Sequence, residues 1–247
     1  MSYEQFAYLY DELMNDVPYH KWAELVGDCI EKYHPQARQL LDLACGTGQL
    51  SIRFAEKGLS VTGVDLSEDM LSVAQTKSAE KGLDIRYYQQ NMAELEGLGP
   101  FDVIGIFCDS LNYLQSEEEV RETFQRVREH LNDQGLFIFD VHSIYKVMQI
   151  FMNQTFAIAD EEISYIWNCF QGEFPNSIEH ELSFFVLDQN TGKYDRYDEL
   201  HFQRTFPVET YKEWLSQAGF ELLAVTADFE EVPPQAQSER VFFICRK

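Results

Sequence analysis

Two short segments of the chain combine residue types that could hold an adenosine-type ligand. In the first, the apolar run Leu40–Leu43 leads into a turn that contains Ala44, Gly46 and Gly48. Glycines in such a turn let a ligand approach the backbone, where a side chain would block it. In the second, Asp65 ends the next apolar run, 17 residues after Gly48, and a carboxylate there can accept hydrogen bonds from both hydroxyls of a ribose. Together they predict an adenosine site at the carboxyl edge of a parallel sheet.

The pattern fits two ligands, NAD and S-adenosylmethionine, and the charge of the turn discriminates between them. Asp42 opens the turn, close to where NAD would place its pyrophosphate. Two unscreened like charges a few ångströms apart cost about 1–4 kcal/mol at effective dielectric constants of 80 to 20. The ammonium of S-adenosylmethionine would instead be attracted to Asp42. Ser51 is a mild departure from the dinucleotide fingerprint, so the charge decides, and the sequence favours S-adenosylmethionine with NAD as the alternative.

The elements that would position these residues alternate between strands and helices. Five segments are predicted strands, at 40–43, 59–66, 85–89, 101–107 and 135–141, and the fourth is nearly all apolar, as a strand covered on both faces should be. Helical periodicity lies between them; Ser67 can cap one helix, and Ser116 with Glu119 forms a capping box for another. Five alternations over about 110 residues predict a parallel sheet with helices on both faces.

The pattern changes after the fifth strand. Between 155 and 206 apolar residues alternate with a period of two, first over 178–186 and again over 200–206, with a turn at 190–192. We therefore expect an inserted antiparallel β subdomain at 151–206. A helix from Pro207 to Gly219 and strands at 220–227 and 240–246 would follow. The main domain would then comprise 1–150 and 207–247, with helices in 1–33 ahead of the first strand.

Composition restricts the setting and the partners. The chain has 247 residues, and 19 basic against 42 acidic residues give a net charge of −23, which repels phosphate backbones and anionic membranes and argues against a nucleic-acid substrate. The five cysteines form no C-x-x-C pair, which favours a reduced, cytoplasmic protein without a structural metal site. The acidic N-terminus does not resemble a signal peptide, and no apolar run is long enough to span a membrane.

Five segments in order resemble the class I S-adenosylmethionine-dependent methyltransferases: LLDLACGTG, GVDLSEDML, YYQQNMAEL, FDVIGIF and GLFIFDV. The resemblance covers about residues 35–145 and extends to Gly219-Phe220. It implies an α/β fold, a Rossmann-like doubly wound, mostly parallel seven-stranded sheet with a small antiparallel β insertion. The opening FAYLYDELM and the insertion after the fifth strand are similar to the helical cover and the substrate-covering subdomain of small-molecule methyltransferases.

The resemblance also implies roles for single residues around the cofactor. The methionine part would lie against the turn, the ribose against the carboxylate at the end of the second strand, and the adenine between apolar side chains. The residues that match these positions are Asp42, Ala44, Gly46, Gly48, Asp65, Leu66, Met70, Asn91, Met92 and Cys108. Two departures stand out: Asn91 replaces the more frequent Asp, and Ala44 replaces a glycine, a small-for-small change that we expect to be harmless.

The segment after the fourth strand lies at the rim where the reacting group is expected. Asp109, Asn112 and Tyr113 are the substrate-side candidates, and His142, just past the fifth strand, or Asp109 could take a proton. Each has a structural alternative, because 109–113 could be a capped loop and His142 a hydrogen-bonded loop histidine. Asn91 could likewise be a turn residue.

Aromatic residues near the N-terminus could close over the sulfonium or over a cationic substrate by cation–π contacts, worth about 0.5–2 kcal/mol each. These candidates are Tyr8, Tyr10 and Trp22. They could equally pack against the sheet.

We therefore expect a methyltransferase that moves a methyl group from S-adenosylmethionine to an oxygen, nitrogen or carbon atom of a small molecule by in-line displacement. Alignment of the reactants would supply much of the rate, about 7–11 kcal/mol in favourable cases. Two alternatives stay open: an NAD-dependent oxidoreductase, and a non-catalytic S-adenosylmethionine-binding partner protein. An enzyme that methylates RNA or protein is disfavoured by the charge.

Overall fold

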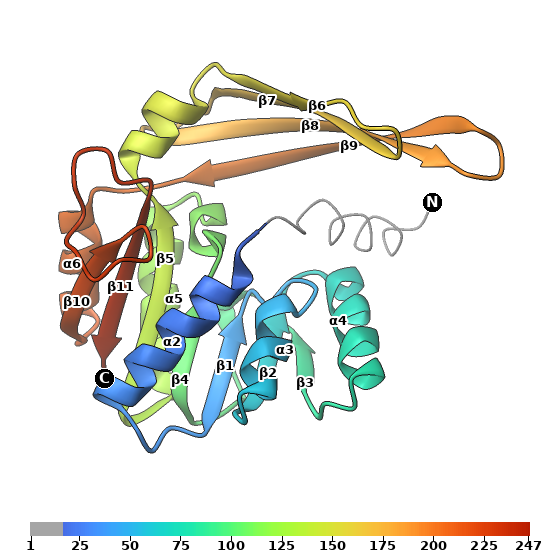
Figure 1. Ribbon diagram of the computed structural model, residues 1–247. Coiled ribbons are helices and arrows are strands. Elements are labelled where there is room, and N and C mark those ends of the chain that lie inside the picture. Colours follow the sequence, from blue (N-terminus) through green and yellow to red (C-terminus); the bar gives the residue numbers. More distant parts are fainter. Residues whose placement is uncertain (1–16) are drawn as a thin grey trace.

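The computed structural model describes residues 17–247 and contains two β-sheets (Figure 1). The larger sheet has seven strands in the order β10-β11-β5-β4-β1-β2-β3. Its parallel strands are β1 (Gln39–Leu43), β2 (Ser60–Asp65), β3 (Arg86–Gln89), β4 (Phe101–Ile106) and β5 (Leu131–His142). At the other edge, β11 (Arg240–Arg246) runs antiparallel to both β5 and β10 (Glu221–Ala227). This order confirms the predicted Rossmann-like, mostly parallel seven-stranded sheet.

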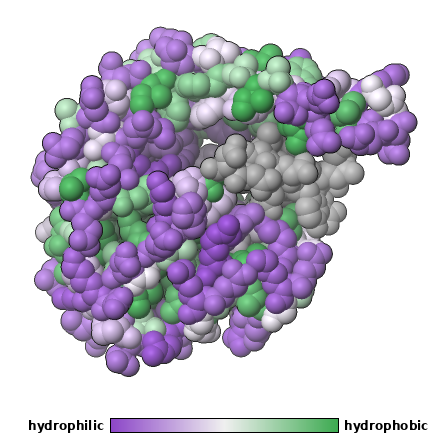
Figure 2. All heavy atoms as spheres, viewed as in Figure 1, coloured by the Kyte–Doolittle hydropathy of each residue, from purple (hydrophilic) through white to green (hydrophobic). Residues whose placement is uncertain are grey.

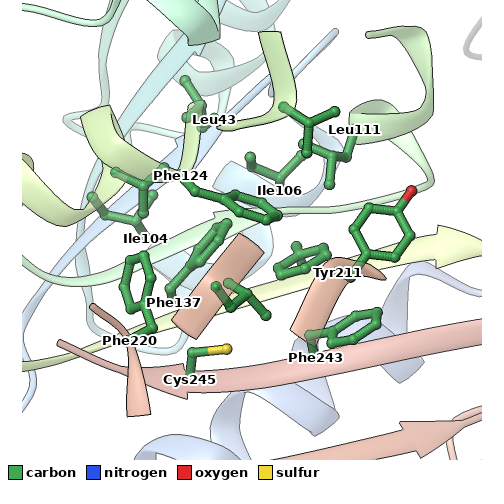
Figure 3. Packing of buried hydrophobic residues seen from close by; sticks show 14 of the residues in the cluster. Leu43, Ile104, Ile106, Leu111, Phe124, Phe137, Tyr211, Phe220, Phe243 and Cys245 are labelled. Atoms are coloured by element: carbon green, nitrogen blue, oxygen red, sulfur yellow. The ribbon is translucent and has the colours of Figure 1, made fainter. Parts of the chain in front are cut away.

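Helices cover both faces of the main sheet, because its central strands are apolar on both sides. On one face lie α2 (Tyr19–Tyr33) and α3 (Gln49–Glu56), whose apolar residues form one core cluster. On the other face lie α5 (Glu117–His130) and α6 (Val208–Gln217). Figure 3 shows this second cluster, in which Phe124 of α5 and Tyr211 of α6 meet Phe137 and Phe243 of the strands. A further helix, α4 (Glu68–Glu80), packs beside β3.

Local sequence signals set most of the helix ends. The hydroxyl of Ser67 accepts a hydrogen bond from the Met70 N–H at 3.3 Å, and Ser116 and Glu119 form the expected capping box. One boundary in the main sheet differs by more than one residue: β5 begins at Leu131 rather than at 135, because Leu131 pairs with Phe101 across a bulge. Three short helical turns complete the main domain: η1 (Met92–Glu94), η2 (Ser110–Tyr113) and the π-helix η3 (Lys146–Phe151).

The second sheet is antiparallel and lies across the carboxyl ends of the main strands (Figure 1). It consists of β6 (Thr155–Ile158), β7 (Ile163–Gln171), β8 (Ser177–Asp188) and β9 (Lys193–Arg204), each paired with the next in sequence. Its inner face packs on η3, where Val147 and Phe151 meet Cys169 and Ile178.

The register assigns the side chains of β9 to two different faces. Glu199, His201 and Gln203 lie on the inner face, because they pair with Leu182, His180 and Ile178 of β8. The apolar residues between them, Leu200 and Phe202, point outward and are 52% and 42% exposed. The sheet therefore presents polar side chains of β9 toward the main domain.

The surface agrees with the composition. Figure 2 shows a mostly hydrophilic face and a hollow between the inserted sheet and the main sheet. Among residues 17–247, none of the helices has both the length and the apolar character that a membrane crossing requires.

Candidate functional site

The glycine turn after β1 leaves backbone open at the carboxyl edge of the sheet. Gly46 has a φ of +53°, and a Cβ placed on it would meet no atom of residues 17–247 within 4 Å. Gly48, with a φ of +77°, leaves no such room, because a Cβ there would lie 2.8 Å from the hydroxyl of Tyr87. Gly46 thus borders space that a ligand can enter, whereas Gly48 permits close packing of α3 against its neighbours.

Ala44 takes part in the same turn at a conformational cost. Its φ is +65°, in the left-handed region where a residue with a Cβ loses about 1–2 kcal/mol. The expectation that alanine is a harmless replacement for glycine is therefore corrected, because the backbone at this position is strained.

The Asp42 side chain lies beneath this turn and is almost fully buried. Its carboxylate accepts a hydrogen bond from the Ser51 hydroxyl at 2.6 Å. Burial raises the pKa of Asp42 to about 7, the Ser51 hydrogen bond opposes the rise, and the negative charge of Asp65 adds to it. A buried carboxylate in this condition is stabilised by a nearby cation, as the ammonium of an amino acid would provide.

Asp65 joins the end of β2 to the turn. One of its oxygens accepts the Gly46 N–H at 2.8 Å, and the other accepts the Ser67 N–H at 2.9 Å. Burial raises the pKa of Asp65, which these hydrogen bonds partly offset. The next residue, Leu66, is 67% exposed, so an apolar surface stands beside the carboxylate, where a flat base could lie.

The expected adenine-edge residues are partly engaged within the protein. The side-chain oxygen of Asn91 accepts the Ala93 N–H at 3.0 Å and caps η1, in agreement with the alternative that Asn91 is a turn residue. Met92 packs against the main core, and Met70 lies half-buried in the first turn of α4. An accepting oxygen has a second lone pair, so Asn91 retains the capacity to meet an amino group.

The chain after β4 takes an uncommon backbone path around Asp140. Cys108 and Asp109 both have a φ of +54°, and their N–H groups donate to the Asp140 carboxylate at 2.9 and 3.0 Å. Asp140 is fully buried in β5 and also pairs with the Arg240 guanidinium. Two successive left-handed residues of this kind persist only where the surroundings hold them. Asp140 therefore fixes the position of Asp109.

The Asp109 carboxylate is surrounded by hydrogen-bond donors. It accepts from Arg240 at 2.8 Å and from the Gln203 amide at 2.8 Å, and His142 Nε2 lies 3.2 Å away. Burial alone would raise the pKa of Asp109, but His142 and Arg240 outweigh it and hold the pKa well below the usual range. A carboxylate held so low is a weak proton acceptor, which leaves His142 as the stronger candidate for a base.

His142 is buried at the end of β5. Its backbone N–H donates to the Asn112 side chain at 2.9 Å, and its carbonyl accepts from Thr205 at 2.6 Å. Its ring atom Nδ1 has no hydrogen-bond partner among residues 17–247. Burial lowers the pKa of His142, Asp109 opposes this, and the positive charges of Arg240 and Lys146 lower it further. His142 is therefore neutral at pH 7.

Two of the substrate-side candidates have structural roles instead. Trp22 is 3% exposed, its indole N–H donates to Asp140 at 2.7 Å, and the cation over its ring is Arg240 at 4.9 Å. Asn112 is 1% exposed and joins His142 to the Arg204 carbonyl. The expectation that these two side chains meet a ligand is corrected, because both are closed off by long-range partners. Tyr8 and Tyr10 lie outside the described residues.

Tyr113 keeps a surface for a ligand, since it is 47% exposed. Its hydroxyl lies 3.2 Å from His201 Nδ1 on the inner face of β9, and His201 Nε2 is 4.0 Å from a Glu199 oxygen. Burial raises the pKa of Tyr113, and the charges of Asp109, Glu199 and Asp65 add to the rise. The hydroxyl thus stands among groups of the cofactor edge, the rim and the inserted sheet.

Sequence reasoning missed three residues that organise this site: Asp140, Arg240 and Gln203. Asp140 is the single charge within the buried run of β5, and a lone acid in an apolar strand is the one signal that marked it. Arg240 and Gln203 are separated from Asp109 by 131 and 94 residues. No local pattern reports such distant pairs.

Comparisons with known proteins agree with the geometry. A family model described as a methyltransferase domain matches residues 40–135. A protein described as a methyltransferase from Geobacillus sp. strain WCH70 is 52% identical, over 100% of both chains. The crystal structure of an S-adenosylmethionine-dependent methyltransferase from Clostridium acetobutylicum is 31% identical with a TM-score of 0.90, over 99% of this chain and 98% of that one.

A more distant structure shares the fold. An amino pentose methyltransferase from Micromonospora echinaspora, solved with S-adenosylmethionine bound, is 19% identical with a TM-score of 0.76. The match covers 97% of this chain and 95% of that one.

Proposed function

The chain belongs to the class I S-adenosylmethionine-dependent methyltransferases, and from this premise we propose that it methylates a small molecule bound between the two sheets. The observation that carries the proposal is the meeting of three elements at one edge: the open glycine turn, the buried His142 and the half-exposed Tyr113 under the inserted sheet. NAD-dependent oxidation and a purely non-catalytic role are not favoured by the similarity to methyltransferases over the full chain.

The residues at the β1 and β2 ends fit S-adenosylmethionine. Gly46 borders open space, Asp42 is a buried carboxylate that a cation would stabilise, and Leu66 exposes apolar surface next to Asp65. We assign Asp42, Ala44 and Gly46 to the methionine part, with Gly48 allowing α3 to pack closely behind the turn. When bound, S-adenosylmethionine supplies a methyl group already activated by its positive sulfur, which a nucleophile takes by in-line displacement.

The remaining cofactor contacts follow the same edge of the sheet. We assign the ribose hydroxyls to Asp65, and the adenine to the side chains that follow β2 and β3, namely Leu66, Met70, Asn91 and Met92. Cys108, which follows β4, is assigned to the cofactor at the rim where the reacting group would lie.

On the acceptor side, we assign His142 as the group that takes a proton and Tyr113 as a contact to the acceptor. A neutral imidazole is in the protonation state that a base requires, which its burial and the nearby cations ensure at pH 7. Asp109 would orient His142 rather than accept the proton itself. A base matters most for a hydroxyl acceptor, since a neutral amine can attack before it loses its proton.

The inserted sheet is proposed to act as the substrate-covering subdomain. Its inner face brings Glu199 and His201 opposite Tyr113. The net charge of −23 and the carboxylate of Glu199 favour a neutral or cationic acceptor over a phosphorylated one. The distant fold neighbour is named for an amino pentose, so small amines and amino sugars are the first acceptors to try. The five cysteines are free, which supports a reduced, cytoplasmic setting.

Transfer of labelled methyl groups from S-adenosylmethionine tests this proposal. The purified protein is incubated with a panel of small amines, amino sugars and alcohols, beside RNA and protein acceptors. We expect product with one class of small molecule, and a loss of at least about 100-fold in kcat with His142→Gln if the acceptor is a hydroxyl. Methylation of RNA or protein alone would overturn the small-molecule proposal. Full turnover by His142→Gln on a hydroxyl acceptor would show that His142 is not the base.

A further inference from the structure

A chain of buried hydrogen bonds runs from the inserted sheet to the rim of the main sheet. It begins at Trp167, whose indole N–H donates to His180 Nδ1 at 3.0 Å. His180 Nε2 lies 3.3 Å from the Gln203 side-chain oxygen, and the Gln203 amide nitrogen donates to an Asp109 oxygen at 2.8 Å. The same Asp109 oxygen lies 3.2 Å from His142 Nε2.

The chemistry of the first residue fixes the direction of every hydrogen bond that follows. An indole N–H only donates, so His180 Nδ1 must accept and carries no proton. His180 therefore holds its proton on Nε2 and donates it to the Gln203 oxygen. The amide of Gln203 is then oriented with its nitrogen toward Asp109.

The other end of the chain imposes the matching constraint on His142. The pKa of Asp109 is held well below its usual range, so its carboxylate only accepts. His142 must then carry its proton on Nε2, and its Nδ1 keeps a lone pair. Nδ1 is buried and finds no donor among residues 17–247.

We propose that Gln203 is a positioning residue of the transfer reaction: it holds the Asp109 carboxylate so that His142 stays in the Nε2–H form, with Nδ1 as the nitrogen that takes the acceptor's proton. This inference rests on the proposed role of His142 as the base. As the acceptor atom forms its bond to the methyl carbon, the bond from that carbon to the sulfur of S-adenosylmethionine would break with its electron pair left on sulfur, S-adenosylhomocysteine would leave, and the acceptor's proton would move to His142 Nδ1.

Burial supports a specific role for Gln203. The residue is 4% exposed, and a buried amide is costly unless both of its ends are paired. Both ends are paired here, one with His180 of the inserted sheet and one with Asp109 of the rim. An apolar side chain at position 203 would pack beside Ile178 without the cost of burying an amide, but Asp109 would lose one of its hydrogen-bond donors.

Several charged or titratable groups face His142, and they set the direction of the effect. Asp109 precedes η2, Arg240 comes from β11, Lys146 from η3, and His180 from β8. Replacement of Gln203 removes one neutral donor from Asp109 and leaves the other groups in place. The carboxylate then attracts a protonated His142 more strongly, so the pKa of His142 rises.

Nitrogen NMR of the histidine rings tests the inference without any acceptor. The full-length protein is labelled with nitrogen-15 in its six histidines, and His142→Gln and His180→Gln assign the two rings of interest. Long-range proton–nitrogen spectra, with and without S-adenosylhomocysteine, report which ring nitrogen carries the proton and where each ring titrates. In the wild type we expect both rings in the Nε2–H form.

Two variants and one control separate positioning from packing. Gln203→Leu should raise the titration midpoint of His142 by about one unit, as expected when a carboxylate loses one hydrogen-bond donor. Gln203→Glu keeps the acceptor for His180 and adds a second negative charge, so the midpoint should rise further. Gln171→Leu makes the same change at an exposed position in the same cross-strand row and should leave His142 unchanged.

An unchanged midpoint and tautomer of His142 in both Gln203 variants would overturn the inference. So would a wild-type His142 with its proton on Nδ1. These outcomes are distinct from a failure of the proposed function, which is read from methyl transfer by His142→Gln. If Gln203→Leu does not fold, Gln203→Glu retains the size and the sheet register and supplies the test alone.

Discussion

Affinity for the cofactor should depend on pH through Asp42. The carboxylate is buried with a pKa of about 7, and the bound ammonium would require it to be ionised. A proton must then leave Asp42 whenever the ligand binds below that pH. Because the pKa is raised in the free protein, the affinity is about half of its maximum near pH 7, rises toward the maximum above that pH and declines as the pH falls below it.

The magnitude follows from the ionised fraction. With a pKa near 7, about one half of Asp42 is ionised at pH 7 and about 3% at pH 5.5, so the dissociation constant should rise about 15-fold. The window must stay at or below pH 7, because the ligand's own amino group starts to lose its proton near about pH 7.7–8.0.

Calorimetric titration with S-adenosylhomocysteine at pH 7.0, 6.5, 6.0 and 5.5 measures this dependence. Repeating each titration in two buffers of different ionisation enthalpy counts the protons released. Asp42→Asn should bind more weakly at pH 7 and lose most of the pH dependence, whereas Glu68→Gln, an exposed acid at the start of α4, should retain it. An equal dependence of the dissociation constant on pH in the wild type and in Asp42→Asn would refute the reasoning, because a group other than Asp42 would then be titrating.

The remaining predictions concern stability and the acceptor. Gly48→Ala should lower the free energy of unfolding by about 2 kcal/mol in urea titrations, because the φ of +77° at this position suits glycine. As a control, Gly27→Ala lies within α2 with free space around it among the described residues, and it should raise the free energy of unfolding by about 0.5–1 kcal/mol. Arg240→Met should cost about 3–5 kcal/mol, since it leaves Asp140 buried without its cation; a loss under 1 kcal/mol would contradict this. Tyr113→Phe should change stability by less than about 1 kcal/mol yet raise the KM for the acceptor, and an unchanged KM would remove it from the acceptor site.

The fold was predictable because its signals are local. The central parallel strands are rich in apolar residues, and capping residues such as Ser67 and Ser116 mark helix starts within three residues. The parallel arrangement of the central strands followed from the alternation of strand and helix. The cofactor edge was predictable for the same reason, since Gly46 lies in the turn after β1, Asp65 ends β2, and the Gly46 N–H meets the Asp65 carboxylate at 2.8 Å.

The acceptor side depended on contacts that no local pattern reports. Trp22 is an aromatic residue near the N-terminus, and its burial is decided by Asp140, 118 residues away. Asn112 is closed off by Arg204 from the inserted sheet. The alternating pattern of β9 predicts two faces without telling which one points inward, and Gln203 gains its role only from the register with β8.

Ligand preference tests the central claim most directly. The purified protein is titrated by calorimetry with S-adenosylmethionine, S-adenosylhomocysteine, NAD and NADP at pH 7, and each titration is repeated with Asp65→Ala. We expect the two sulfur nucleotides to bind at micromolar concentrations, the nicotinamide nucleotides not to bind, and Asp65→Ala to lose at least tenfold in affinity while it stays folded. Binding of NAD or NADP alone, or unchanged affinity of Asp65→Ala, would contradict the assignment of this edge of the sheet.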